Sequence, residues 1–171
     1  MLIGLAGLAR SGKSTAAEAL CDELGFVELS FADPIRKAVK SIFSLTDEQV
    51  YGAEKETVIP WLGKSPRQLM QSLGTEWGRH CVADDVWMRL VDRDISRHGD
   101  VVVSDLRFEN EAAFIRERGG VVIHIQRPIC EQVNAHESEL GVKVLADDVE
   151  LVNDRDRDAF VELVCDVVQV L

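Results

Sequence analysis

The chain has 171 residues, of which 46% are hydrophobic, and 30 acidic side chains against 19 Lys and Arg give a formal net charge of −11. This length corresponds to one compact domain with a sizeable core. The negative charge argues against binding along a nucleic acid, because a duplex would repel such a surface. The apolar runs have strand length and no basic segment precedes the first one, so we expect neither a membrane span nor a secretion leader. The four cysteines lack the close spacing of a zinc site, which favours reduced thiols.

The negative charge is concentrated late in the chain. Residues 33–107 carry 11 basic and 12 acidic side chains, whereas residues 108–171 carry six and 14. Much of this excess lies in residues 147–158, which we expect on an outer surface. The arginines of the nearly neutral middle region are therefore candidates for binding anions.

Strand and helix patterns alternate along the chain. Apolar runs predict buried strands over residues 2–6, 26–31, 101–103, 121–125 and 149–152. Amphipathic spacing predicts helices that begin near residues 13, 34, 46, 66, 85, 108 and 160. Asp33 is expected as the N-cap of the second helix, with Pro34 at its first position. Leu69, Leu73 and Trp77 recur every four residues, which places them on the inner face of the fourth helix.

This alternation predicts an α/β protein of three layers, in which helices cover both faces of a mostly parallel sheet. The largely helical residues 33–99 lie between the second and third strands and are long enough to form an inserted lobe. We find no internal repeat and no Gly/Ser linker, so residues 1–171 are expected to form a single domain.

The first strand is followed by a phosphate-binding motif. Residues 7–14, Gly-Leu-Ala-Arg-Ser-Gly-Lys-Ser, match G-x-x-x-x-G-K-[ST] at every fixed position and precede a helix, which favours a P-loop over a chance glycine-rich turn. Glycines let backbone amides surround a β-phosphate, and the helix N-terminus adds its dipole. Lys13 is expected to bridge the β- and γ-phosphates and Ser14 to bind Mg²⁺. The predicted nucleotide ligands are Gly7, Ala9, Arg10, Ser11, Gly12, Lys13, Ser14 and Thr15.

Two polar residues follow the third strand. Asp105 is the candidate acid that orients Mg²⁺, with helix capping as the alternative. Arg107 is close enough in sequence to face the same phosphates, although it is also spaced to pair with Glu111 one helical turn later.

The P-loop alone leaves the class of protein open. A GTPase would need an Asn-Lys-x-Asp motif, which residues 153–156 (Asn-Asp-Arg-Asp) do not supply, and a motor or helicase would be larger. A small-molecule kinase fits the length, with the helical block closing over the acceptor.

Three further segments resemble the phage deoxynucleoside monophosphate kinases. They are residues 31–36 (Phe-Ala-Asp-Pro-Ile-Arg), 67–79 (with Gly-Thr-Glu-Trp-Gly-Arg at their end) and 105–111 (Asp-Leu-Arg-Phe-Glu-Asn-Glu). With the P-loop, their order and spacing cover most of the chain. The resemblance implies the P-loop nucleoside monophosphate kinase fold, with five parallel strands in the order 2-3-1-4-5. It also implies transfer from ATP, with Mg²⁺, to a deoxynucleoside monophosphate, giving a diphosphate for DNA synthesis.

The resemblance also implies a site for the acceptor nucleotide. Arg67 would clamp its phosphate, and Arg107 and Arg127 would join Lys13 at the transferring group, Arg127 from a lid-like segment over residues 127–146. The other residues carried over as acceptor ligands are Asp33, Arg36, Gln68, Gln71, Glu76, Arg79, His136 and Ser138. Each of three of these roles has an equal structural alternative. Asp33 could instead cap its helix, Arg79 could lie on the solvated surface, and residues 136–139 could form a solvated helix turn.

Other features have simpler readings. His124 lies in an apolar strand and is expected to be a core histidine with its hydrogen bonds satisfied. Trp77 and Trp87 are expected in the core, whereas the role of Trp61 in its loop stays open. The phage relatives imply a homodimer that acts on small nucleotides in the host cytoplasm, with no nucleic-acid polymer and no membrane as partner. Two other functions remain open: a P-loop kinase for another small acceptor, such as dephospho-coenzyme A, and a non-catalytic ATP-binding regulatory protein.

Overall fold

The computed structural model describes residues 1–128 and 141–171. The chain divides into two compact units, one made of Met1–Ser30 with Val91–Leu171 and the other of Phe31–Leu90. The first unit contains the sheet, and the second is mainly helical.

The first unit is built on a five-stranded parallel sheet in the order β2-β3-β1-β4-β5. This confirms the predicted α/β fold and its strand order. The strands are β1 (Leu2–Ala6), β2 (Val27–Leu29), β3 (Val101–Leu106), β4 (Val121–Gln126) and β5 (Val149–Val152). Because β1 pairs with both β3 and β4, the segments that follow these three strands emerge at one edge of the sheet. That carboxyl edge is where parallel α/β sheets bind ligands.

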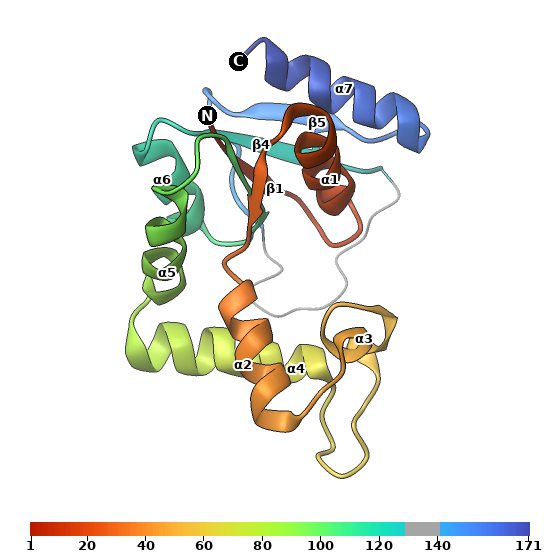
Figure 1. The fold of residues 1–171 in the computed structure, drawn as a ribbon, viewed down its shortest axis with the longest axis vertical. Coiled ribbons are helices and arrows are strands. Elements are labelled where there is room, and N and C mark those ends of the chain that lie inside the picture. Colours follow the sequence, from red (N-terminus) through yellow and green to blue (C-terminus); the bar gives the residue numbers. More distant parts are fainter. Residues whose placement is uncertain (129–140) are drawn as a thin grey trace. The chain divides into compact units, whose positions relative to one another are not determined.

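Alternate residues of β1 face two helical layers. Ile3 and Leu5 are fully buried in a core that α1 (Lys13–Leu24) and α7 (Arg157–Gln169) share through side chains such as Leu20 and Phe160. Gly4 faces the other side, where a Cβ would lie 3.0 Å from Ile115 of α6 (Glu109–Glu117). Figure 1 shows α1 and α7 together on one side of the sheet and α6 on the other, which gives the predicted three layers.

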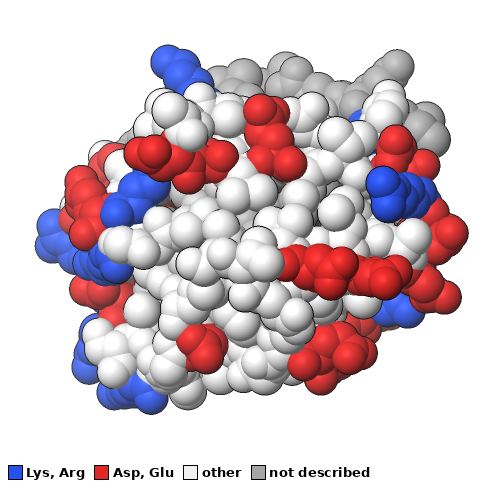
Figure 2. Space-filling view, turned by 90° about the horizontal axis from the view of Figure 1, so that it is seen from above, with Lys and Arg blue, Asp and Glu red and all other residues white. Residues whose placement is uncertain are grey.

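Acidic side chains are scattered among uncharged residues on the α7 side of the first unit, with Lys and Arg side chains toward the edges of the view (Figure 2). The exposed acidic residues of this C-terminal region include Asp147, Glu150, Asp154, Asp156, Asp158, Glu162 and Asp166. The predicted outer acidic surface is therefore confirmed, except at Asp148, whose side chain is only 2% exposed. No helix in the described parts of the chain is long and apolar enough to cross a membrane.

The second unit is a set of short helices. They are α2 (Asp33–Phe43), α3 (Asp47–Val50), the 3₁₀ helix η1 (Ala53–Glu56), α4 (Pro66–Gln71), the π-helix η2 (Ser72–Val82) and the start of α5 (Val86–Ile95). Ser65 caps α4, because its hydroxyl accepts from the Gln68 N–H while the Gln68 side chain accepts from the Ser65 N–H.

Asp33 does not cap α2 as predicted. The helix begins at Asp33 itself, Ala32 occupies the cap position, and no side chain caps this end. The Asp33 carboxylate instead lies 2.8 Å from Lys37 Nζ one turn later. An acid in the first turn favours the helix through the dipole even without a capping bond.

The prediction of a buried Trp77 is also wrong, since this side chain is 53% exposed. The four-residue spacing assumes α-helical geometry, but residues 72–82 form a π-helix, whose wider turn no longer stacks residues four apart. Trp87 is buried as predicted, and its Nε1 donates a 2.8 Å hydrogen bond to the Gly74 carbonyl oxygen. Its ring fills the space beside Gly78, where a Cβ would lie 2.3 Å from it.

Candidate active site

The P-loop follows β1 and ends at the first turn of α1. Its two fixed glycines have backbone angles that other residues rarely adopt, with φ of 145° at Gly7 and 113° at Gly12. Neither position has room for a side chain, since a Cβ would lie 2.4 Å from the Ile125 carbonyl oxygen at Gly7 and 2.4 Å from Asn153 Nδ2 at Gly12. The glycines therefore allow both the turn and its close packing against neighbouring strands.

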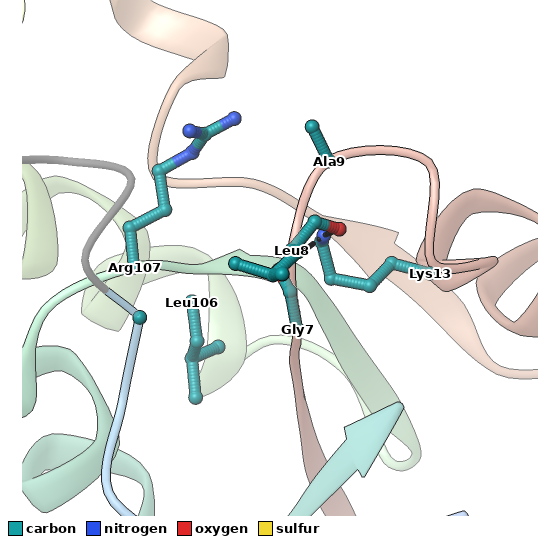
Figure 3. Close-up of a pocket in the computed structure, with 7 residues that line it drawn as sticks. Gly7, Leu8, Ala9, Lys13, Leu106 and Arg107 are labelled. Atoms are coloured by element: carbon teal, nitrogen blue, oxygen red, sulfur yellow. Dashed lines mark hydrogen bonds between the residues drawn. The ribbon is translucent and has the colours of Figure 1, made fainter. Parts of the chain in front are cut away.

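Lys13 lies inside this loop. Its ammonium group donates hydrogen bonds to the carbonyl oxygens of Gly7 (2.6 Å) and Leu8 (2.7 Å), so the loop curls around its own lysine (Figure 3). A positive charge at the start of α1 reinforces the helix dipole as an attraction for phosphate. Ser14, the next residue, is exposed at the same helix end.

Asp105 lies at the end of β3, beside the P-loop strand. It is 8% exposed, and its Oδ2 accepts a 2.6 Å hydrogen bond from the Ser30 hydroxyl, which follows β2. Capping does not explain this aspartate, because β3 continues to Leu106 and Phe108 occupies the cap position of α6.

These residues fit a bound Mg²⁺. The hydroxyl of Ser14 and the carboxylate of Asp105 are the hard oxygen donors that this ion prefers. Across the described ranges, no three His, Cys, Asp or Glu side chains gather as a metal site. Few protein ligands are expected for a Mg²⁺ that is held mainly by nucleotide phosphates and water.

Arg107 and Lys13 approach one small pocket from opposite sides (Figure 3). The register explains this placement, because Ala6 of β1 lies opposite Leu106 of β3 and the residues after both strands line the pocket. The Glu111 carboxylate accepts from the backbone N–H groups of Arg107 (2.7 Å) and Phe108 (3.1 Å), which anchors the start of α6. The pocket is lined by Gly7, Leu8, Ala9, Lys13, Leu106, Arg107 and Gly141.

Two buried polar contacts near the P-loop were not predicted. One is Ser30 with Asp105, and the other is Asn153, whose Nδ2 donates a 2.8 Å hydrogen bond to the Ser11 carbonyl oxygen. These partners are 75 and 142 positions apart in sequence, so local patterns carry no sign of the pairing. Only their position near the ends of predicted strands could have pointed to them, Ser30 inside the strand predicted over residues 26–31 and Asn153 directly after that over 149–152, since parallel strands end at one edge.

His124 is a satisfied core histidine, as predicted. Its Nε2 lies 2.9 Å from Asp148 Oδ2, and the same carboxylate accepts hydrogen bonds from Arg116 (2.6 Å) and the Leu145 N–H (2.8 Å). Burial opposes ionisation of Asp148, but the hydrogen bonds from Arg116, Leu145 and His124 outweigh it and lower the pKa from 3.8 to about 2. Arg116 also reaches the Lys143 carbonyl oxygen, so this cluster fixes residues 143–148 against α6 and β4.

The predicted acceptor residues Arg67, Gln68 and Gln71 all lie on α4 of the second unit. Arg67 is largely buried, and its Nε donates to the Glu56 carboxylate. The Gln71 Nε2 atom is buried and has no hydrogen-bond partner in the described structure. A buried amide without a partner is costly, so Gln71 is suited to a polar ligand.

The other predicted acceptor residues are more scattered. Arg36 extends over the Tyr51 ring, with its guanidinium carbon 5.8 Å from the ring centre, and lies 3.9 Å from Asp33. Arg79 is 6% exposed and donates a 2.7 Å hydrogen bond to the Asp84 carbonyl oxygen, so it is not the solvated surface arginine of the alternative reading. Glu76 is exposed on the π-helix.

The lid-like segment is described only in part. Arg127 is exposed directly after β4, whereas His136 and Ser138 lie outside the described residues. Residues 141–146 belong to the first unit, and Gly141 lines the P-loop pocket.

The comparisons with known proteins define the family. The sequence model of the protein family described as deoxynucleotide monophosphate kinase matches residues 61–164 of this chain. A protein of Acanthamoeba polyphaga mimivirus, named for the same activity, is 41% identical over 177 residues, which cover 94% of this chain and 92% of the relative. The chain belongs to the deoxynucleotide monophosphate kinase family.

One further relative agrees with this assignment, and one solved structure matches the fold. The deoxynucleoside-5′-monophosphate kinase of Escherichia phage T5 is 36% identical over 75 residues, which cover 43% of this chain and 30% of the phage protein. The dephospho-CoA kinase of Campylobacter jejuni has a similar structure, with a TM-score of 0.50 and 18% identity over 98% of this chain and 95% of that one. At this identity the structural likeness shows the fold alone, which is that of a P-loop kinase.

Proposed function

We propose that this kinase transfers the γ-phosphoryl group of ATP to a deoxynucleoside 5′-monophosphate and so forms the diphosphate. The observation that carries the proposal is a complete P-loop, with its lysine inside the loop, in a chain that matches a family member over 94% of its length. The family membership favours a deoxynucleotide over dephospho-coenzyme A as acceptor.

The donor side follows from the first unit. ATP phosphates would enter the P-loop, and Lys13 would exchange its bonds to the Gly7 and Leu8 carbonyl oxygens for bonds to phosphate oxygens. Gly12 and the first turn of α1 would supply backbone N–H groups to the same phosphates. The remaining predicted loop ligands, Ala9, Arg10, Ser11 and Thr15, lie along the loop and the start of α1.

Ser14 and Asp105 would hold Mg²⁺, and Ser30 would keep the Asp105 carboxylate oriented. When bound, the ion neutralises charge that develops on the donor phosphates. The two ligands come from different segments at the same edge of the sheet, so both depend on the pairing of β1 with β3.

The acceptor needs no general base, because its phosphate oxygen is already an anion. We propose that Arg67 binds this phosphate and that Arg107 and Arg127 offset charge on the group in transfer, as positively charged clamps do in other phosphoryl transfers. Gln68, Gln71, Asp33, Arg36, Glu76 and Arg79 are the proposed contacts to the rest of the acceptor, with His136 and Ser138 in addition.

The reactants are free nucleotides rather than a polymer in this proposal. The acidic α7 side would repel a duplex, whereas Lys13 and Arg107 give the P-loop pocket local positive charge. We further propose that the enzyme works as a homodimer in the cytoplasm of an infected host. Sedimentation of the purified chain tests the dimer.

An acceptor panel tests the proposed reaction. ADP release from ATP and Mg²⁺ is followed with dAMP, dCMP, dGMP or dTMP, with dephospho-coenzyme A and with no acceptor. We expect release that depends on at least one deoxynucleotide and exceeds the rate without acceptor by orders of magnitude. ADP release with dephospho-coenzyme A alone would contradict the proposal and favour a kinase for that acceptor. Nucleotide binding with no acceptor-dependent release would also contradict it and favour a regulatory protein.

A further inference from the structure

Asn153 is a buried polar residue that the proposed reaction does not use directly. It follows β5, is 7% exposed, and its Nδ2 donates a 2.8 Å hydrogen bond to the Ser11 carbonyl oxygen inside the P-loop. Its backbone N–H donates to the Gln126 carbonyl oxygen at 2.7 Å, at the end of β4. One residue therefore ties the ends of β4 and β5 to the phosphate loop.

The contact between Asn153 and the loop is also steric. The ideal Cβ position at Gly12 lies 2.4 Å from Asn153 Nδ2 and 3.2 Å from the Phe160 ring. Gly12 holds a φ of 113°, which glycine tolerates, but Arg10 holds a φ of 66°, a left-handed conformation that residues other than glycine populate sparsely. Such conformations persist only where the surroundings enforce them.

The hydrogen bond fixes the direction of one peptide group. In a planar trans peptide the C=O and the following N–H point in opposite directions. Because the Ser11 carbonyl oxygen points at Asn153, the N–H of Gly12 points away from Asn153. An amide held in that direction costs little to reorganise when an anion binds to it.

We propose that Asn153 is a positioning residue for the donor nucleotide, which presents the Gly12 N–H to the donor phosphates by holding the Ser11 carbonyl group. This rests on the proposed ATP-dependent function. The residue type fits the role, because the amide of Asn is a donor where the isosteric carboxylate of Asp is only an acceptor. An aspartate here would set two oxygens against each other and add negative charge beside the phosphates.

Asn153→Asp and Asn153→Ala test this role, with Asp154→Asn as the matched control. Asp154 is the exposed neighbour, and its variant makes the reverse exchange in the same loop. ADP and ATP binding is measured by calorimetry, without any acceptor, so the result stands even if the acceptor proves not to be a deoxynucleotide. We expect about tenfold or greater loss of affinity for Asn153→Asp, a smaller loss for Asn153→Ala and none for Asp154→Asn.

Two further measurements separate positioning from general stability. The KM for ATP should rise while the KM for the deoxynucleotide stays within about twofold, whereas a merely structural residue would change both together. In the unsubstituted chain, the side-chain amide protons of Asn153 should be protected from exchange both with and without ADP. Unchanged ADP affinity in a folded Asn153→Asp chain, or rapid exchange of this amide in the ADP complex, would overturn the proposal.

Discussion

The Ser30 hydroxyl donates a 2.6 Å hydrogen bond to Asp105 Oδ2, which joins the end of β2 to the end of β3 beside the P-loop strand. Both residues are buried, with exposures of 9% and 8%. A ligand carboxylate that is held in this way meets a metal ion already oriented, as outer-shell partners do in other metal sites.

Ser30→Ala should therefore raise the Mg²⁺ concentration needed for half-maximal activity by about tenfold or more, because the Asp105 carboxylate loses the hydrogen bond from Ser30. The Mg²⁺ dependence of ADP release measures this effect. Ser41→Ala, at an exposed serine of α2, serves as the control. An unchanged Mg²⁺ requirement in the Ser30→Ala chain would contradict the account that Ser30 orients Asp105 toward the metal ion.

Gly12 and Gly25 provide a matched pair for the P-loop geometry. Both have positive φ, but a Cβ at Gly12 would lie 2.4 Å from Asn153, whereas nothing lies within 4 Å of the same position at Gly25. Each change to Ala should cost roughly 1 kcal/mol of stability from backbone strain. Only Gly12→Ala should also abolish ADP binding, which calorimetry measures. Equal ADP affinity in the two variants would contradict the account that a Cβ at residue 12 disrupts the P-loop by colliding with Asn153.

Arg67→Ala should raise the KM for the deoxynucleotide about tenfold or more and leave the KM for ATP within about twofold, because this arginine is proposed to bind only the acceptor phosphate. Arg97→Ala removes an exposed arginine that pairs with Asp94 and should change neither value. Steady-state kinetics with each substrate varied in turn distinguish the two cases. A parallel rise in both KM values would show that Arg67 acts through the fold.

The lowered pKa of Asp148 predicts how the free energy of unfolding depends on pH. Its folded-state pKa of about 2 lies below the usual 3.8, so its contribution is fully present above about pH 4 and is lost as the pH falls toward 2. The expected loss is roughly 2 kcal/mol, since the side chain is almost fully buried. Urea unfolding at pH 6, 4 and 3 should show about half of this loss, roughly 1 kcal/mol, by pH 3 in the native chain and a smaller one in Asp148→Asn. The same pH dependence in both chains would exclude Asp148 as its source.

Much of the first unit could be predicted from the chain itself. The strands have continuous apolar runs because both faces of a parallel sheet are buried, and the P-loop motif has fixed spacing because its glycines have no room for a side chain. The strand order came from the family resemblance and is confirmed. Local patterns and family motifs therefore described the scaffold and the donor loop.

The errors and omissions have physical causes. Trp77 is exposed because the chain widens into a π-helix at Ser72, which four-residue spacing does not reveal. Ser30 and Asn153 were missed because their roles depend on partners brought to one edge of the sheet by folding. A single serine or asparagine after a strand has no distinctive pattern of its own.

The transfer itself is the most direct test of the central claim. The full chain is incubated with ATP labelled at the γ-phosphate, Mg²⁺ and each deoxynucleoside monophosphate, and the products are separated. We predict that label appears in a deoxynucleoside diphosphate in an amount equal to the ADP formed, and that Lys13→Ala, while folded, lowers this by several orders of magnitude. Label found only in inorganic phosphate, or near-normal transfer by a folded Lys13→Ala chain, would contradict the account.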